Sequence, residues 1–319
     1  MGYWLNRLRR GARRLLAGPQ PAILMYHRVA QPQADPWGLA VSPTNFAAQM
    51  RALKRLRRPV SLDEMAQRLA NGALERGMVA ISFDDAYRDV LTNAKPVLQD
   101  LGIPATVFVV TGKLGDERGF WWDRLAAAVL SGDLPERLPP FSFLGGTEWK
   151  AADQAREQED RDGLHLRLWE VVRLLPPDGR EAATDEVCSA FAGATAVPAP
   201  VMTEAELGDL TAGGLISIGA HTMTHPSLPS LSTEDQRAEI AGSKQRLEAI
   251  TGQPIRRLAY PFGDYDERSM TIARDLGFDY AVSVEAGPVG DSAARFRLPR
   301  HDIKNWTGEE FARRLRWRI

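Results

Sequence analysis

The sequence predicts an α/β fold in which parallel strands alternate with helices. Short apolar runs rich in β-branched and aromatic residues recur along the chain, as expected for buried strands. Most of these runs are followed, after a short connection, by a segment with helical apolar spacing, and this order indicates a parallel sheet or barrel. The expected strands, about seven in number, are residues 22–27, 78–83, 105–110, 215–220, 258–263, 280–284 and 296–298.

The expected helices carry recognisable start signals. Ser42 is a plausible cap, Pro43 suits a first turn, and Phe46, Met50 and Leu53 then share one helix face. The predicted helices of the alternating pattern are residues 42–56, 62–69, 93–101, 203–210, 232–250, 266–276 and 307–317.

The alternation breaks at Gly112 and resumes near Val201. Between them the sequence shows apolar residues at helical spacing and no clear buried strand. We interpret residues 113–200 as a mostly helical insertion on one barrel loop, where insertions usually shape the substrate cleft. Trp121 and Trp122 at its start could stack on sugar rings, or could anchor the insertion to the barrel.

Composition narrows the classes of partner and compartment. The chain has 319 residues, of which 44% are hydrophobic and 25% charged, as in a soluble globular protein with a substantial core. A formal net charge of −1 gives no reason to expect a nucleic acid partner. Cys188 is the single cysteine, so no internal disulfide can form. No apolar run approaches the ~18 residues of a membrane-spanning helix.

Residues 1–17 form a distinct basic segment. Five arginines are interleaved with Trp4 and four leucines, and no continuous apolar core of a secretory signal is present. The segment is predicted to be either a basic amphipathic helix on an anionic membrane surface or an ordinary surface helix of the barrel that follows from residue 18 to residue 319. We therefore expect a cytoplasmic protein, with peripheral membrane contact in the first case.

The strand at residues 78–83 ends in two adjacent carboxylates, Asp84 and Asp85. In parallel α/β sheets and barrels, catalytic groups lie where strands end at their C-terminal edge. Two carboxylates placed together in a partly dry pocket repel each other, so one should be neutralised by a cation or hold a proton. The alternative is that one of them merely caps the next helix.

Two histidines follow another predicted strand. His221 and His225 are four residues apart directly after residues 215–220, and side chains at this spacing on a helical turn can bind one ion. Two imidazoles and one carboxylate would leave open positions on a divalent ion, and the second carboxylate could then act as a base. The alternative is a pair of core histidines beside capping aspartates. His27, at the end of the first strand, also lies on this edge, although a lone histidine is more often structural.

Taken together, residues 82–85 (SFDD) and 221–225 (HTMTH) resemble the first two motifs of the polysaccharide deacetylase family, also known as the NodB-homology domain or carbohydrate esterase family 4. The resemblance covers about residues 22–110 and 202–303. It implies a distorted (β/α)7 barrel that removes N-acetyl groups from amino sugars of a polysaccharide or glycolipid. It also implies a bound Zn²⁺, or another divalent ion such as Co²⁺ or Mn²⁺.

The resemblance assigns roles to individual residues of the two matching motifs. Asp85, His221 and His225 correspond to the family's metal ligands, and Asp84 corresponds to its general base.

The remaining family motifs match imperfectly. The Arg-x-Pro-Tyr motif corresponds to residues 259–262 (AYPF), so its arginine is missing, and Arg300 is a candidate replacement. The backbone N–H of Phe262 is expected to help hold the oxyanion. The Leu-x-His motif, which supplies a general acid, is best matched by residues 298–301 (LPRH), one residue too long. His301 is our candidate acid, but neighbouring strand residues point opposite ways, so Arg300 could face the site instead.

Three functions compete at this point. The first is metal-dependent deacetylation of an amino sugar. The second keeps the same site but acts as a deformylase or deacylase of a lipid-linked amino sugar, which the basic N-terminal segment favours. The third is a non-catalytic sugar-binding barrel, which the missing arginine favours and the complete set of aspartates and histidines opposes.

Overall fold

The structure is a computed structural model of the chain. The residues that it describes are 19–135, 138–144, 158–196, 199–317 and 319. The predicted N-terminal helix at residues 1–17 therefore lies outside the described residues.

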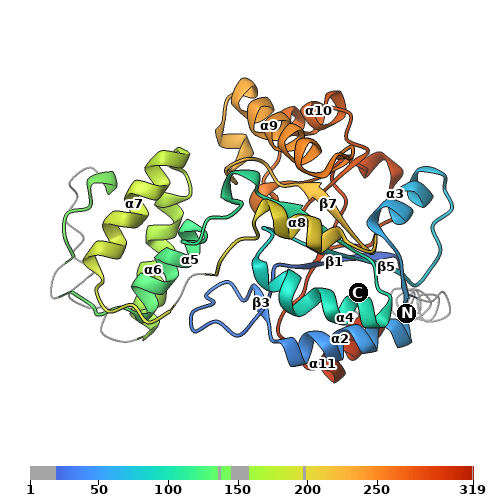
Figure 1. Cartoon of the computed structure of the whole chain (residues 1–319), viewed down its shortest axis with the longest axis horizontal. Helices are drawn as coiled ribbons and strands as arrows, with labels where there is room; N and C mark the ends of the chain where they lie inside the picture. Colours follow the sequence, from blue (N-terminus) through green and yellow to red (C-terminus); the bar gives the residue numbers. More distant parts are fainter. Residues whose placement is uncertain (1–18, 136–137, 145–157, 197–198, 318) are drawn as a thin grey trace, which may run out of the picture.

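A curled parallel sheet of eight strands forms the centre of the molecule (Figure 1). The hydrogen-bonded path runs in the order β10, β1, β5, β6, β7, β8, β9, and β4 pairs with β5 from the side. This arrangement confirms the predicted α/β barrel class. The strands of the sheet are β1 (Ala22–Tyr26), β4 (Arg58–Pro59), β5 (Met78–Phe83), β6 (Ala105–Val109), β7 (Ile216–Ala220), β8 (Arg257–Ala259), β9 (Tyr280–Val282) and β10 (His301–Asp302).

Two of the predicted strands differ from expectation: one is shorter, and the other forms only an isolated bridge. The strand expected at residues 258–263 stops at Ala259, because the 3-10 turn η6 (Pro261–Gly263) follows, with Phe262 at a φ of 57°. The strand expected at residues 296–298 contributes only an isolated bridge between Val282 and Leu298. A separate two-stranded parallel sheet, β2 (Arg28–Val29) with β3 (Ala40–Val41), was not anticipated either.

Helices cover the outer face of this sheet. α11 packs on α2, and α10 packs on α9, so that the helices form a layer around the strands. The helices outside the predicted insertion are α2 (Pro43–Leu56), α3 (Leu62–Ala70), α4 (Lys95–Leu101), α8 (Glu204–Thr211), α9 (Thr233–Thr251), α10 (Glu267–Asp275) and α11 (Gly308–Trp317).

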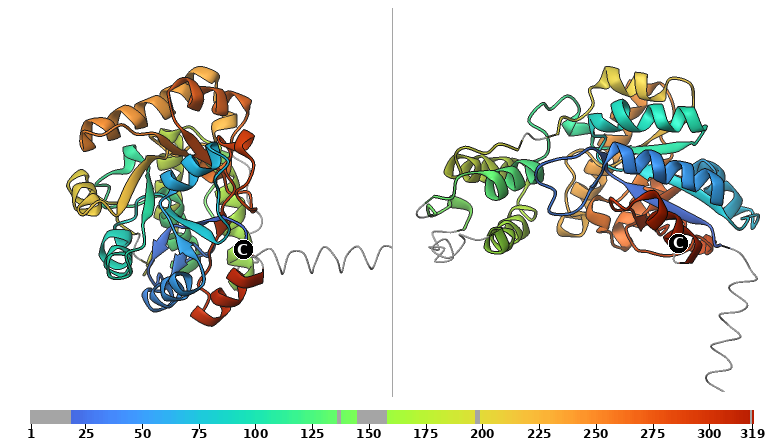
Figure 2. Two further views of the ribbon diagram at one scale, coloured as in Figure 1. Left: turned by 90° about the vertical axis from the view of Figure 1, so that its right-hand side faces the viewer. Right: turned by 90° about the horizontal axis from the view of Figure 1, so that it is seen from below.

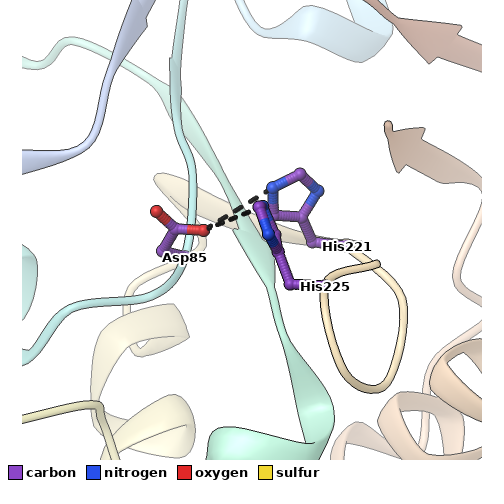
Figure 3. A group of neighbouring side chains, drawn as sticks. All are labelled: Asp85, His221 and His225. Carbon is purple, nitrogen blue, oxygen red and sulfur yellow. Dashed lines mark ion pairs between the residues drawn. The ribbon is translucent and has the colours of Figure 1, made fainter. Parts of the chain in front are cut away.

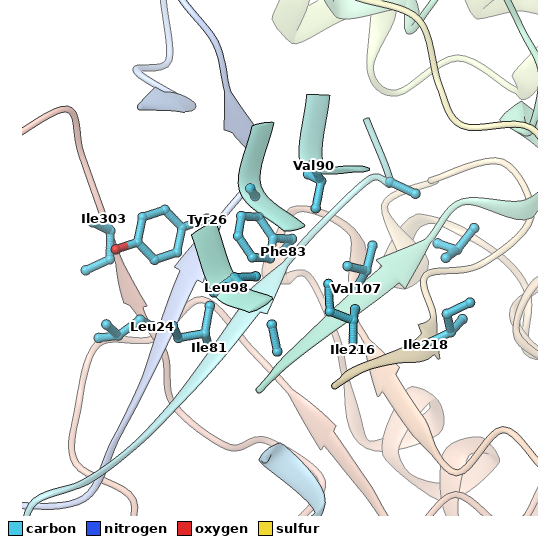
Figure 4. Packing of buried hydrophobic residues seen from close by; sticks show 14 of the residues in the cluster. Leu24, Tyr26, Ile81, Phe83, Val90, Leu98, Val107, Ile216, Ile218 and Ile303 are labelled. Atoms are coloured by element: carbon cyan, nitrogen blue, oxygen red, sulfur yellow. The ribbon is translucent and has the colours of Figure 1, made fainter. Parts of the chain in front are cut away.

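The alternation of side chains along each strand divides the core into two faces. Ile81 and Phe83 point to the outer face, where they pack with helix residues such as Leu98 (Figure 4). Ala80 points inward and packs with Phe108 in a second cluster. Every residue of β5 is buried, as expected for a parallel strand covered on both faces. Ser82 and Asp84 continue the inward series, so the strand delivers its last polar side chains to the barrel interior.

The predicted insertion contains three long helices, α5 (Trp121–Ser131), α6 (Gln158–Val172) and α7 (Pro177–Ala190). They lie together at one end of the molecule, beside the sheet (Figures 1 and 2). They share a hydrophobic cluster of their own, rich in aromatic residues, which reaches the barrel through residues such as Tyr87 and Val110. Trp121 and Trp122 are buried in this cluster, so they do anchor the insertion.

None of the helices among the described residues is long and apolar enough to cross a bilayer.

Candidate metal centre and active site

The two strand-end motifs meet at one edge of the sheet (Figure 3). Asp84 and Asp85 follow β5, and His221 follows β7, with β6 between these two strands. Parallel strands present their C-terminal ends at the same edge, so residues far apart in sequence converge there. The chain then turns sharply at Asp85, with a φ of 73°, and again at His225, with a φ of 55°.

Asp85, His221 and His225 form a compact group of potential ligands. Asp85 Oδ1 lies 3.6 Å from His221 Nε2 and 3.6 Å from His225 Nε2. The three ligand atoms all lie within 4.8 Å of one another, and all three residues are buried. Distances of 3.6 Å are too long for hydrogen bonds.

The electrostatics of this group call for a cation. Burial, with the neighbouring charges of Asp84 and Asp123, raises the pKa of Asp85 well above its ordinary value. Burial also lowers the pKa of His221 to about 4 and that of His225 well below its ordinary value, so both imidazoles are neutral at pH 7. A buried carboxylate beside two neutral imidazoles is a donor set that a divalent ion would satisfy.

The geometry of these three residues also suits a divalent cation. Asp85 Oδ1 is buried and has no hydrogen-bond partner within the described chain. Ligands 2.0–2.2 Å from a tetrahedral ion lie roughly 3.4 Å from one another. The two separations of Asp85 Oδ1 from the histidine Nε2 atoms, 3.6 Å each, are close to this value. His221 Nδ1 lies 2.8 Å from the carbonyl oxygen of Ala259, and such a contact fixes the tautomer that leaves Nε2 free to bind metal. The residues present therefore fit a divalent ion.

Asp84 is held by a different partner. Arg300 Nη1 and Nη2 each donate to one carboxylate oxygen of Asp84 at 2.7 Å, and Arg300 Nε donates to the Ser283 carbonyl at 2.8 Å. Burial alone would raise the pKa of Asp84, but the Arg300 guanidinium lowers it to about 2. Arg300 thus takes the place of the arginine missing before Tyr260, and Asp84 remains an oriented anion.

A cavity of about 450 Å³ opens onto these groups. Its floor includes Asp84, Asp85 and both histidines of the metal group. His27, at the end of β1, also lines it.

The predicted acid His301 does not reach this cavity. His301 is in register with Leu24, whose side chain belongs to the outer, helix-covered face. The next pair in the register, Met25 and Asp302, lines the cavity. The pleat therefore turns Arg300 and Asp302 inward and His301 outward, which corrects our expectation for His301. Among the cavity-lining residues of the described chain, His27 is the histidine outside the metal group.

Phe262, whose backbone N–H we expect to help hold an oxyanion, lines the cavity. The backbone of Phe262 adopts a left-handed conformation, with a φ of 57° and a ψ of 1°, in the turn after β8. The ring packs edge-on against His225, with centroids 4.4 Å apart, and against Trp169, with centroids 5.8 Å apart. Phe262 thus lies between a potential metal ligand and the insertion.

Aromatic residues from two separate segments form another wall of the cavity. The ring centroid of Trp169, from α6 of the insertion, lies 4.7 Å from that of Trp37, which precedes β3. Both rings line the cavity, together with Arg173. Arg173 lies over the Trp169 ring at 5.2 Å and contacts Asp264 at 3.3 Å. Both indoles are partly buried, and indole faces at a cavity wall suit the apolar faces of sugar rings.

Sequence reasoning missed part of this site. His27 carried a usable signal, because it ends a predicted strand at the catalytic edge. Trp37 and Trp169 carried none, because no strand end or motif distinguishes them and 132 residues separate them in sequence. Only the fold brings these two rings together.

Comparison with protein families identifies a broad relationship. The family model described as polysaccharide deacetylase matches residues 71–159 and 185–281, more than half of the chain. A Bacillus subtilis protein named as a polysaccharide deacetylase, YxkH, is 29% identical over 99 residues, which are 31% of this chain and 35% of that protein. The poly-β-1,6-N-acetyl-D-glucosamine N-deacetylase of Staphylococcus aureus is 34% identical over 79 residues, 24% of this chain and 27% of that enzyme. The matched segments thus span about a third or less of these relatives.

Solved structures share the fold over nearly the whole chain. IcaB from Ammonifex degensii superposes with a TM-score of 0.62 at 19% identity, covering 94% of this chain and 98% of that one. The Streptococcus pyogenes deacetylase PplD, solved with acetate, gives a TM-score of 0.58 at 20% identity, covering 93% of this chain and 98% of that one. With the family model matched across both strand-end motifs, the chain belongs to the polysaccharide deacetylase family.

Proposed function

We propose that this protein is a metal-dependent hydrolase that removes N-acetyl groups from the amino sugars of a glycan. The observation that carries the proposal is the convergence of Asp84, Asp85, His221 and His225 on one cavity, in a chain of this family. The complete ligand group, and the replacement of the missing arginine by Arg300, count against a non-catalytic sugar-binding barrel.

Asp85, His221 and His225 would hold the divalent ion. When bound, such an ion supplies a Lewis acid that lowers the pKa of water and polarises the substrate carbonyl. Three protein ligands leave coordination positions open, as catalytic sites require. We propose Zn²⁺ as the resident ion, with Co²⁺ or Mn²⁺ as alternatives, because a mixed imidazole and carboxylate set accepts each of them.

The remaining groups divide the proton transfers. Asp84, kept ionised and oriented by Arg300, takes the proton from the attacking water. The backbone N–H of Phe262 donates a hydrogen bond to the developing oxyanion. His27 is our candidate for donating a proton to the departing amine nitrogen, because it is the histidine outside the metal group among the described residues that line the cavity. Burial lowers the pKa of His27, so its imidazole must take up a proton before it donates one.

The cavity walls support a sugar substrate. Trp37 and Trp169 offer aromatic surface next to the reacting groups, and Arg173 offers hydrogen-bond donors at the same wall. The relative named as a poly-β-1,6-N-acetyl-D-glucosamine deacetylase suggests N-acetylglucosamine polymers as the first substrates to test. A glycolipid carrying the same sugar is the alternative substrate form.

The direct test is release of acetate from β-1,6-linked N-acetylglucosamine oligomers by the full chain. Activity should disappear after chelation and return on addition of Zn²⁺, Co²⁺ or Mn²⁺. Parallel detection of formate from a formylated amino sugar distinguishes deacetylation from deformylation. Absence of acetate with all three metals, on oligomers and on a lipid-linked amino sugar, would contradict the proposed activity.

We also propose that residues 1–17 attach a cytoplasmic protein peripherally to the membrane. Their five arginines and interleaved apolar residues favour binding to an anionic surface. The protein should then sediment with anionic liposomes at low salt and be released at high salt, because salt screens surface charge. Equal sedimentation of a chain lacking residues 1–17 would contradict this role.

A further inference from the structure

The loop that carries the two histidines is conformationally strained. Within the described chain, five non-glycine residues have a positive φ, and all five are cavity residues or their close neighbours: Asp85, Ala86, Thr222, His225 and Phe262. Such conformations are unfavourable for residues other than glycine and persist only when surrounding contacts fix them. The contacts that fix residues 222–225 are therefore part of what builds the ligand group.

His221 and His225 are held in different ways. The ring of His221 is fixed by its Nδ1 contact with the Ala259 carbonyl. His225 Nδ1 is buried and has no hydrogen-bond partner in the described chain. The His225 ring is instead packed between Trp122 and Phe262, with centroids 4.8 and 4.4 Å away. Its orientation therefore depends on ring packing and on its own backbone.

The backbone around His225 is fixed from two sides. On the barrel side, Glu239 of α9 accepts hydrogen bonds from the N–H groups of Met223 and Thr224, both at 2.9 Å. On the other side, Arg180 donates from Nη1 to the His225 carbonyl at 2.8 Å and from Nη2 to the Thr224 carbonyl at 3.1 Å. Arg180 belongs to α7, so this second support comes from the insertion.

Burial of the Arg180 guanidinium at this position is energetically unfavourable. Arg180 is 2% exposed and forms no ion pair in the part of the chain that the structure describes, and burial lowers its pKa although the charges of Glu239 and Glu181 partly offset this effect. Its Nε is also buried without a partner. Burying a cation is unfavourable, whereas an apolar side chain of similar length would pack without that penalty. The hydrogen bonds that offset this penalty go to the loop that carries His225, because Nη2 also lies 3.4 Å from Thr224 Oγ1 in addition to the two carbonyl contacts.

We propose that Arg180 is a positioning residue that holds His225 in its metal-binding orientation, so that the insertion supports the metal centre as well as walling the cavity. This inference rests on the proposed metal site. It goes beyond our expectation that the insertion shapes the substrate cleft, because removal of Arg180 should weaken metal binding even without substrate.

The test measures binding of Co²⁺ alone to the metal-free full chain, by calorimetry and by the visible absorption of the bound ion. Arg180→Met removes both donors at similar length and should raise the Co²⁺ dissociation constant roughly 10–100-fold, as for other supports of metal ligands. It should also alter the Co²⁺ spectrum, because the His225 ring is no longer fixed. Arg180→Lys restores the charge and one donor, and should give an intermediate loss.

The matched control is Arg161→Met in the same insertion. Arg161 Nη1 also donates to two backbone carbonyls, those of Val129 and Gly132, but they lie in the insertion itself. This variant should keep the parent affinity and spectrum. Circular dichroism and thermal unfolding of the metal-free proteins establish whether each variant folds. If Arg180→Met does not fold, the Co²⁺ affinity of Arg180→Lys tests the positioning role.

The outcomes separate this inference from the proposed function. Parent-like Co²⁺ binding by the folded Arg180 variants overturns the positioning role alone. An equal loss in Arg161→Met also overturns it, because the effect would then come from general loosening of the insertion. Failure of the parent chain to bind Co²⁺ overturns the metal site itself and the proposed function with it.

Discussion

The barrel and the insertion contribute to the same cavity in opposite ways. The barrel supplies most of the charged and titratable groups, at or just after strand ends, over a core of mainly aliphatic side chains. The insertion supplies mainly aromatic surface, from Trp122 and Trp169, together with Arg173, over a separate aromatic cluster. The proposed reacting groups therefore lie on the sheet, whereas the insertion contributes substrate-facing aromatic surface and, through Arg180, holds the loop that carries His225. This division lets substrate preference change at residues such as Trp169 while the strand-end groups stay in place.

The largest expected effects come from the barrel carboxylates. Asp85→Ala should lower bound metal and acetate release together, because one of three protein ligands is lost. Asp84→Asn should keep near-normal metal and lose ~10²–10⁴-fold in turnover, the usual range for a positioned base. Excess metal should partly restore the Asp85 variant and leave the Asp84 variant inactive. Metal content measured beside turnover checks both, and loss of metal in Asp84→Asn with retention in Asp85→Ala would reverse the assignment.

The second prediction distinguishes two barrel histidines on opposite faces of the sheet. His27→Asn should lose ~10²-fold or more in turnover, since a proton donor to the amine is removed. His301→Asn should stay close to the parent, because its side chain points to the outer face. Steady-state kinetics on one oligomer would check both variants. The reverse pattern would restore His301 as the acid.

The third prediction moves to the insertion and is smaller. Trp169→Ala should raise KM up to roughly tenfold with turnover little changed, because ring stacking contributes about 0.5–1.5 kcal/mol to substrate binding. The matched control is Leu166→Ala on the same helix, a residue that is 43% exposed and does not line the cavity. A large fall in turnover for Trp169→Ala would break the division between chemistry and binding surface.

The last prediction concerns the stability of the insertion and not turnover or substrate binding. His165 in α6 is 2% exposed and packs on Trp37, and burial lowers its pKa to about 4, although Asp162 raises it in part. In the unfolded state His165 has an ordinary pKa near 6.5 and therefore binds a proton more tightly than in the folded state. The contribution of His165 to the free energy of unfolding is therefore complete above pH 6.5, and acidification from pH 6.5 to pH 4 should lower that free energy by up to roughly 3 kcal/mol.

This pH effect can be isolated by subtraction. The free energy of unfolding of the parent is compared with that of His165→Phe at pH 7 and pH 5, so that contributions of other groups cancel. The parent should lose more stability than the variant on acidification. Equal losses would show that His165 does not carry the effect.

Much of the barrel was predictable because its signals are local. The apolar strand at residues 78–83 followed by two carboxylates, and the paired histidines after residues 215–220, specified both the edge and the residues of the candidate metal group. The position of the last strand was not predictable, because β10 is a two-residue strand defined by pairing with β1 rather than by its own composition. That uncertainty of a few residues is what misplaced the acid at His301, since a strand shifted by one residue reverses its faces.

The support for the metal centre within the insertion was beyond sequence reasoning. Arg180 lies in a polar helix and lacks a motif, and the carbonyls that it holds lie 44 and 45 residues further along the chain. Contacts of this kind depend on how the insertion folds back on the barrel. A periodic apolar pattern specifies only that a helix exists and which of its faces is buried.

The pairing of Asp84 with Arg300 has a consequence for the order of synthesis. The two residues are 216 positions apart, and Arg300 precedes a strand that joins the sheet beside β1. Until the ribosome has released this late segment, Asp84 lacks its counter-charge, and its buried carboxylate has no partner to keep it ionised and oriented. Contacts so distant in sequence form slowly, because a long loop must close first. A nascent chain would therefore be able to gather Asp85, His221 and His225 before Asp84 is held in place, so the proposed activity would begin only when β10 docks.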